Sequence, residues 1–209
     1  MKKIIFILAI LITAPSFAQS KYEIGMQQAL DLWNAEKHWE AANLFERIAQ
    51  AEPDNWLPPF YVAQINVIYS FGEKDETKLT AQLGKARDFL NDAMAISKDN
   101  PELMVVDAQL YTAWVAFDGQ RYGMQYAGKV AQIYQEASQI APDNPRVVLG
   151  KAEWDMGSAQ FFGQPVDAYC KDITKAIELF EKFEPESQFH PKGGIDRAKQ
   201  VQETSCKKE

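Results

Sequence analysis

Apolar residues recur every three or four positions along most of the chain, the spacing that places them on one face of an α-helix. The stretch from Trp39 to Ala49 shows the pattern well, because Ala42, Phe45 and Ile48 fall on the same stripe. No long run alternates apolar and polar residues as a half-buried β-strand does. The pattern therefore predicts an all-α chain. Its helices are expected in pairs within residues 22–55, 56–97, 101–141 and 145–185, followed by a polar helix over 195–206.

Three triplets interrupt the helical pattern at nearly equal spacing. They are Pro53-Asp54-Asn55, Lys98-Asp99-Asn100 and Pro142-Asp143-Asn144, and their first residues stand 45 and 44 positions apart. An alanine lies ten residues after the start of each triplet: Ala63, Ala108 and Ala152. A fixed period of this kind is typical of a repeat array in which each unit packs mainly on its neighbours. We expect the alanines at helix contacts and the three Asp-Asn turns in equivalent places.

The repeated units resemble the tetratricopeptide repeat, in which small residues mark the helix crossing, a large residue follows in the second helix and a proline closes the unit. The first unit matches with Ala29, Ala41, Phe45, Ile48 and Pro53. The resemblance implies a short right-handed α-solenoid of about four antiparallel helix pairs over residues 19–187. Residues 188–209 are then expected to form a loop, a C-terminal capping helix and a tail.

The later units depart from this family in length. Ala29 and Ala41 are 12 positions apart, as in the repeat of about 34 residues. The matching distances in the next three units are 23, 22 and 24: Ala63 to Ala86, Ala108 to Val130 and Ala152 to Ala176. We therefore expect extended turns between the helices of these units, and HEAT-like packing is the alternative fold.

The first 18 residues read as a secretory signal peptide. Lys2 and Lys3 precede an apolar run over 4–12, and Ser16-Phe17-Ala18 forms a small-x-small cleavage site. The run is shorter than the roughly 20 residues that a membrane-spanning helix needs. The mature chain is therefore expected to be exported, periplasmic or secreted, and not embedded in a membrane. Loss of the two lysines takes the net charge from −7 to −9, which makes nucleic acid an unfavourable partner.

The chain has two cysteines, Cys170 and Cys206, and neither has a second cysteine at CxxC spacing. An even number of cysteines in an exported protein predicts a disulfide, which here would tie the capping helix to the fourth unit. A thiol-active protein that uses one of these cysteines is the alternative.

The sequence offers little chemistry. It contains no metalloprotease, nucleophile-elbow, phosphate-loop or dinucleotide-binding motif. Both histidines, His38 and His190, are expected in turns or caps, and no cluster has the ligand count that zinc requires. The Asp-Asn turns match no calcium loop. We therefore expect neither an enzyme nor a bound cofactor or metal.

The resemblance implies a binding surface, because the first helix of each pair faces the concave side in this family. The positions carried over are Phe60, Gln64, Val67, Val105, Gln109, Thr112, Leu149, Glu153 and Met156. Gln64, Gln109 and Glu153 would form a polar ladder along the groove, with ordinary solvated surface as the plainer interpretation.

Two functions follow from these expectations. The leading hypothesis is an exported scaffold that binds an unidentified protein or peptide in the bacterial cell envelope, without chemistry. The alternative is a soluble envelope protein that binds a small ligand between the concave face and the extended turns. Apolar residues near the turns would line that pocket: Phe71, Phe117, Tyr122, Phe161 and Phe162.

Overall fold

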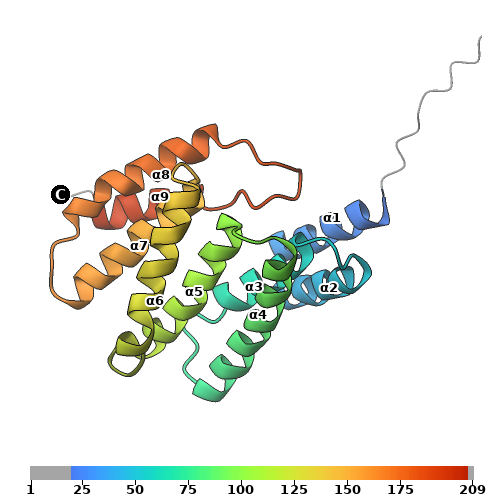
Figure 1. The fold of residues 1–209 in the computed structure, drawn as a ribbon, viewed down its shortest axis with the longest axis horizontal. Helices are drawn as coiled ribbons and strands as arrows, with labels where there is room; N and C mark the ends of the chain where they lie inside the picture. The colour runs from blue at the N-terminus through green and yellow to red at the C-terminus, as the bar shows by residue number, and fades with distance from the viewer. Residues whose placement is uncertain (1–19, 207–209) are drawn as a thin grey trace, which may run out of the picture.

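The computed structural model describes residues 20–206, and these fold entirely into helices and their connections (Figure 1). The helices are α1 (Lys21–Asn34), α2 (His38–Ala51), α3 (Leu57–Ile68), α4 (Glu76–Ile96), α5 (Pro101–Phe117), α6 (Gly119–Ile140), α7 (Pro145–Phe161), η1 (Asp167–Tyr169), α8 (Cys170–Lys182), α9 (Ile195–Val201) and η2 (Gln202–Cys206). The predicted signal peptide, residues 1–18, lies outside the described residues. Within 20–206, no helix has both the length and the apolar character needed to cross a membrane.

The predicted fold class is confirmed. Each α-helix packs on the next one along the chain, and α3, α5 and α7 also contact one another as the stacked first helices of successive pairs. Ala63, Ala108 and Ala152 are all buried, as helix axes can approach closely only where side chains are small.

Each of the three Asp-Asn turns caps the helix that follows it. In each turn the asparagine side chain accepts a hydrogen bond from a backbone N–H of the helix that follows, and so satisfies one of its free amides. The accepting residues are Asn55, Asn100 and Asn144, and the bonds from Leu57, Glu102 and Arg146 measure 3.0, 2.9 and 2.9 Å.

The extra residues of the later units do not all lie in turns. In the third unit, Asp118 alone separates α5 from α6, so the prediction of an extended turn is wrong there. One residue suffices because the Asp118 side chain caps α6 by accepting from the amides of Gln120 and Arg121. The added length goes into helices: α4 and α6 have 21 and 22 residues, against 14 in α2. Among the turns that join the two helices of one pair, only 69–75 and 162–169 are longer than the 35–37 turn.

A long C-terminal segment closes the array. The segment 183–194, which we call the strap, leaves α8, runs along the array towards its first unit, and returns to α9 beside α8 (Figure 1). Phe189 marks the far point of this path: its ring lies edge-on to Tyr22, and its carbonyl accepts a 2.8 Å hydrogen bond from the Tyr61 hydroxyl.

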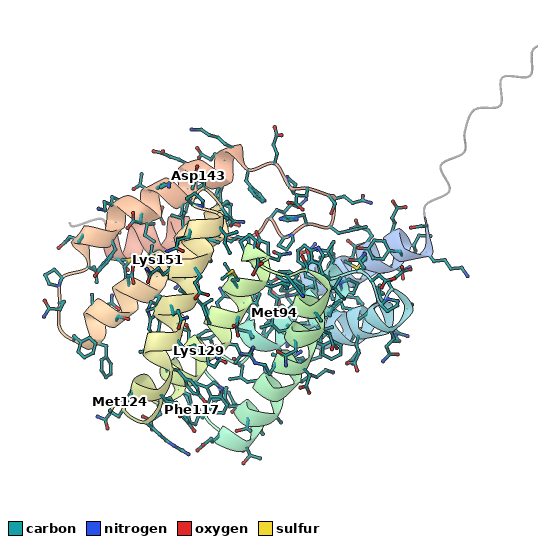
Figure 2. All side chains as sticks on the ribbon, in the orientation of Figure 1. Met94, Phe117, Met124, Lys129, Asp143 and Lys151 are labelled. Atoms are coloured by element: carbon teal, nitrogen blue, oxygen red, sulfur yellow. A yellow bond between two sulfur atoms is a disulfide. The ribbon has the colours of Figure 1, made fainter. Side chains whose placement is uncertain are left out.

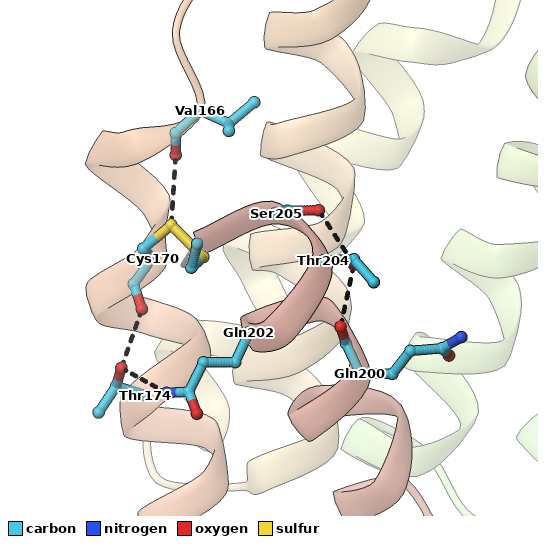
Figure 3. Close-up of a disulfide and its surroundings, with 8 residues drawn as sticks. Val166, Cys170, Thr174, Gln200, Gln202, Thr204 and Ser205 are labelled. Carbon is cyan, nitrogen blue, oxygen red and sulfur yellow. Dashed lines mark hydrogen bonds between the residues drawn. A yellow bond between two sulfur atoms is a disulfide. The ribbon is translucent and has the colours of Figure 1, made fainter. Parts of the chain in front are cut away.

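The predicted capping helix and its disulfide are both present. Cys170 and Cys206 are bonded, with a Cα–Cα distance of 5.6 Å, so η2 is tied to the start of α8 (Figure 3). Gln202 adds a 3.1 Å hydrogen bond to Thr174 of α8, also visible in Figure 3. Ala198 and Val201 bury the inner face of the cap against α8.

Candidate functional site

The structure places the predicted concave face largely in the core. Six of the nine carried-over residues are buried: Phe60, Gln64, Val67, Val105, Leu149 and Met156. Helix α3 shows why, because every residue from 57 to 67 is buried where it packs on α2, α4 and α5. The apolar members of the face therefore serve as core, and a ligand cannot reach them in this structure.

The remaining three residues are half-buried, and each has its own surroundings. Glu153 forms a 2.6 Å ion pair with Arg197 of the capping helix, and the Thr112 hydroxyl donates to the carbonyl of Ala108. The side-chain oxygen of Gln109 is enclosed without a hydrogen-bond partner among residues 20–206. With Gln64 buried and Glu153 paired, the predicted polar ladder does not form an open row.

A buried charged cluster holds the strap against the stacked units. Glu102 is 1% exposed, and its carboxylate forms an ion pair with Arg146 at 2.5 Å and accepts a hydrogen bond from Asn144 at 2.7 Å. His190 of the strap lies 3.8 Å from the same carboxylate, and Arg146 also donates to the carbonyl of Gly193. These contacts join the third unit, the fourth unit and the strap.

The electrostatics of this cluster keep Glu102 charged. Burial alone would raise the pKa of the Glu102 carboxyl, but His190, Arg146 and Asn144 together outweigh it, so the pKa lies below its ordinary value. Such a cluster fixes the packing of the strap against the third and fourth units. We assign it a structural role.

Exposed apolar side chains gather at another place, the edge of the array where the two helices of each pair are joined. We call this set the turn edge: Trp39, Ile68, Tyr69, Phe71, Met124, Phe161 and Phe162. Trp39 begins the second helix of its pair, residues 68–71 lie at the α3–α4 connection, and Phe161 ends α7. Figure 2 shows Met124 at the same end of the molecule as Phe117, the last residue of α5.

The exposure of these side chains is large for aromatic groups. Phe161 and Phe162 are 62% and 73% exposed, and Trp39 and Phe71 are 46% and 44% exposed. Large exposed aromatic side chains of this kind make the turn edge a candidate interaction surface.

Two shallow clefts flank the first part of the turn edge. One, of about 310 Å³, lies between the α3–α4 connection and the end of α5. Its lining is Ser70, Gly72, Glu73, Lys74, Ala113, Ala116, Phe117 and Asp118. The other, of about 430 Å³, is bordered by α1, α2 and their turn. Its lining is Gln28, Asp31, Leu32, Ala35, Lys37 and Leu44.

The five aromatic residues predicted for a turn-side pocket share this edge but do not line one pocket. Phe117 lines the first cleft. Tyr122 is instead buried, and its hydroxyl donates a 2.6 Å hydrogen bond to Glu76. Phe161 lies over the start of α6, because a Cβ added to Gly119 would meet its ring at 3.1 Å.

An aromatic cluster links the first two units at the turn edge. The imidazole of His38 stacks on the Tyr69 ring with centroids 3.8 Å apart and planes 14° apart, and Trp39 lies edge-on to His38 at 4.9 Å. His38 is the first residue of α2, directly after the 35–37 turn in which the sequence placed it. No local pattern indicates the stacking, because 31 positions separate His38 from Tyr69.

The cysteines and acidic residues offer no further site. Both cysteines of the chain are in the disulfide, which contradicts the thiol-active alternative. In the described part of the chain, no group of three or more histidine, cysteine or acidic residues is arranged to hold a metal ion.

Comparison with known proteins shows which solved structures share this fold. No family model matches the sequence, and no curated protein matches it. Among solved structures, the HusA haemophore from Porphyromonas gingivalis is similar with a TM-score of 0.76 and 20% identity, covering 88% of this chain and 91% of that chain. A thermophilic TPR protein from Thermus thermophilus is similar with a TM-score of 0.56 and 14% identity, covering 77% of this chain and 89% of that chain. The chain thus has a TPR-like helical-repeat fold. Identities this low show the shared fold alone.

Proposed function

We propose that this protein is an exported, non-enzymatic binding protein that carries a flat apolar ligand of the haem type at its turn edge. The observation that carries the proposal is the collection of exposed aromatic side chains at that edge, beside two clefts. Aromatic rings contribute large contact area to a flat ligand at little entropic cost. The buried concave face, by contrast, offers no comparable surface.

The residues present suit a haem-type cargo. Haem combines an apolar ring with two carboxylates, and each of the two clefts has one lysine, Lys74 or Lys37, among its lining residues. Lys37 has only an exposed 3.9 Å contact with Glu40, so its ammonium group can still meet an anion. The similar fold of a protein titled a haemophore supports the same ligand class.

The disulfide and the haemophore-like fold are compatible with export, because disulfides persist in oxidising compartments. The proposal includes no chemical step. A carrier needs only a surface and a means of releasing what it holds.

The test is a titration of the chain lacking residues 1–18 with ferric haemin, followed by absorption difference spectra. Phe71→Ser removes one exposed aromatic ring from the turn edge, and we expect it to weaken binding about tenfold, since an aromatic contact is worth roughly 1 kcal/mol or more. Ile140→Ser is the matched control, because Ile140 is 50% exposed at the opposite end of α6. Absence of saturable binding, or equal weakening by both variants, would refute the proposal.

A protein partner at the turn edge is the second candidate. The spread of exposed apolar side chains over all four units favours it, because one small ligand cannot cover Trp39 and Phe162 together. The double variant Phe161→Ser with Phe162→Ser separates the two: it should abolish partner crosslinking in envelope extracts and leave haemin affinity unchanged.

A further inference from the structure

The imidazole of His38 is held in a fixed orientation at the protein surface. Its Nδ1 lies 3.1 Å from the backbone carbonyl oxygen of Glu36, one ring face stacks on Tyr69, and Trp39 touches it from the side. Glu36 adopts a φ of +62°, an uncommon value for a residue other than glycine. Three separate contacts therefore restrain a ring that would otherwise rotate freely.

The hydrogen bond to Glu36 decides which ring nitrogen is available. A carbonyl oxygen can only accept, so Nδ1 carries the proton in the neutral ring and the lone pair lies on Nε2. Nε2 has no hydrogen-bond partner within residues 20–206, and His38 is only half-buried. Histidines that bind metals are commonly oriented in this way, with the second nitrogen donating to a backbone carbonyl.

The surroundings of His38 restrict the kind of metal that it can bind. A free ion needs several protein ligands, and the described residues bring no such group together. A metal already held in a macrocycle has its four in-plane positions filled and needs one axial ligand from the protein. Trp39 lies beside the ring and is 46% exposed, so it offers apolar surface to such a macrocycle.

We propose that His38 is the axial ligand for the iron of a tetrapyrrole bound at the turn edge, through Nε2. This inference rests on the proposed function and names the residue that would bind the iron of the proposed ligand. It gives His38 a role beyond the turn position expected from the sequence. Tyr69, whose ring stacks on His38, would then hold the imidazole in position and would not itself bind the iron.

The test uses ferric haemin and the chain lacking residues 1–18. Wild type should show the absorption and electron paramagnetic resonance signature of an imidazole-ligated ferric haem. His38→Ala should lose that signature and bind haemin at least about tenfold more weakly, because loss of the ligand itself should cost no less than loss of a group that only orients a metal ligand. Imidazole added to His38→Ala should restore the signature, because it can occupy the vacated position.

Controls keep the outcomes distinct. Unchanged circular dichroism and melting temperature show that His38→Ala is folded, and the only other histidine, His190, is buried in the strap. If His38→Ala binds haemin with the wild-type spectrum, the axial assignment is overturned while the proposed carrier function stands. If Tyr69→Phe alone changes the spectrum, Tyr69 is the ligand and the assignment is likewise overturned. If wild type does not bind haemin, both proposals are wrong.

Discussion

The charged cluster under the strap gives the sharpest test of how the array is closed. Arg146→Met removes the guanidinium but keeps an unbranched chain about as long as the aliphatic part of arginine. The Glu102 carboxylate, 1% exposed, then keeps only the hydrogen bond from Asn144 and the more distant His190. The strap also loses the bond from Arg146 to the Gly193 carbonyl.

The size of the effect follows from these contacts. Leaving one charge of a buried pair without its partner costs about 3–5 kcal/mol. The lost hydrogen bond to Gly193 adds about 1 kcal/mol. A loss of about 4–6 kcal/mol is a large part of the roughly 5–15 kcal/mol typical of a folded domain. For a protein of this length it corresponds to a fall in melting temperature of roughly 10–20 °C.

Urea unfolding at pH 7, followed by far-ultraviolet circular dichroism, measures this loss directly. The double variant Glu102→Gln with Arg146→Met removes both charges and keeps an acceptor for Asn144. It should recover most of the stability, because the pair is then replaced by neutral groups of similar volume. A loss below about 1 kcal/mol for Arg146→Met alone, the range of a solvent-exposed ion pair, would refute the reasoning.

Three other changes test the fold. The native pKa of Glu102 lies below its unfolded value, so the charged carboxylate stabilises the fold above about pH 4.5 and this stabilisation is lost as the pH falls further. Between pH 6 and pH 3.5, urea unfolding should therefore show a smaller loss in the free energy of unfolding for Glu102→Gln than for wild type. Reduction of the disulfide, which spans 36 residues, should lower the free energy of unfolding by about 3–4 kcal/mol, and an unchanged melting temperature in reductant would contradict this. Gly150→Ala should destabilise the protein by roughly 1–3 kcal/mol, because the new Cβ would lie 2.7 Å from the hydroxyl of buried Tyr134. Gly157→Ala in the same helix has open space around it and should be neutral or stabilising, as calorimetry of both variants would show.

The repeat architecture could be predicted because its signals are local and recur. Each asparagine of the three turns caps the helix immediately after it, so a pattern within a few residues determines the start of that helix. The alanines recur with the same period as the turns, since they occupy the same contact in each unit. The disulfide followed from cysteine count and predicted export.

The length of the connections was harder to predict, because spacing between alanines does not say where added residues go. Asp118 ends one helix and caps the next, so a chain segment that reads as a turn region is almost wholly helical. Glycines at 119, 123 and 128 weaken the local helix signal. Packing of α6 on α5 outweighs that propensity.

The path of the strap depended on contacts that no local pattern reveals. Tyr61 and Phe189 are 128 positions apart, yet the hydroxyl of one bonds to the carbonyl of the other. Residues 184–188 of the strap are polar or proline and exposed, so nothing in the sequence distinguishes them from an ordinary surface loop. The family resemblance supplied the groove positions, and in this chain most of them are buried where the helices pack in the core.

The strap has a consequence for where this protein can bind. In an open solenoid each unit contacts only its neighbours, and the terminal units can unfold separately. Here Phe189 joins the strap to the first unit while the disulfide joins η2 to the fourth, so the two ends of the array are coupled. Displacing the strap would remove His190 and the Gly193 carbonyl from the buried pair of Glu102 and Arg146, at a cost of several kcal/mol. Binding at the turn edge requires no such displacement, because Trp39 and Phe71 are already exposed. The proposed binding at the turn edge therefore leaves the strap and its buried charged cluster intact.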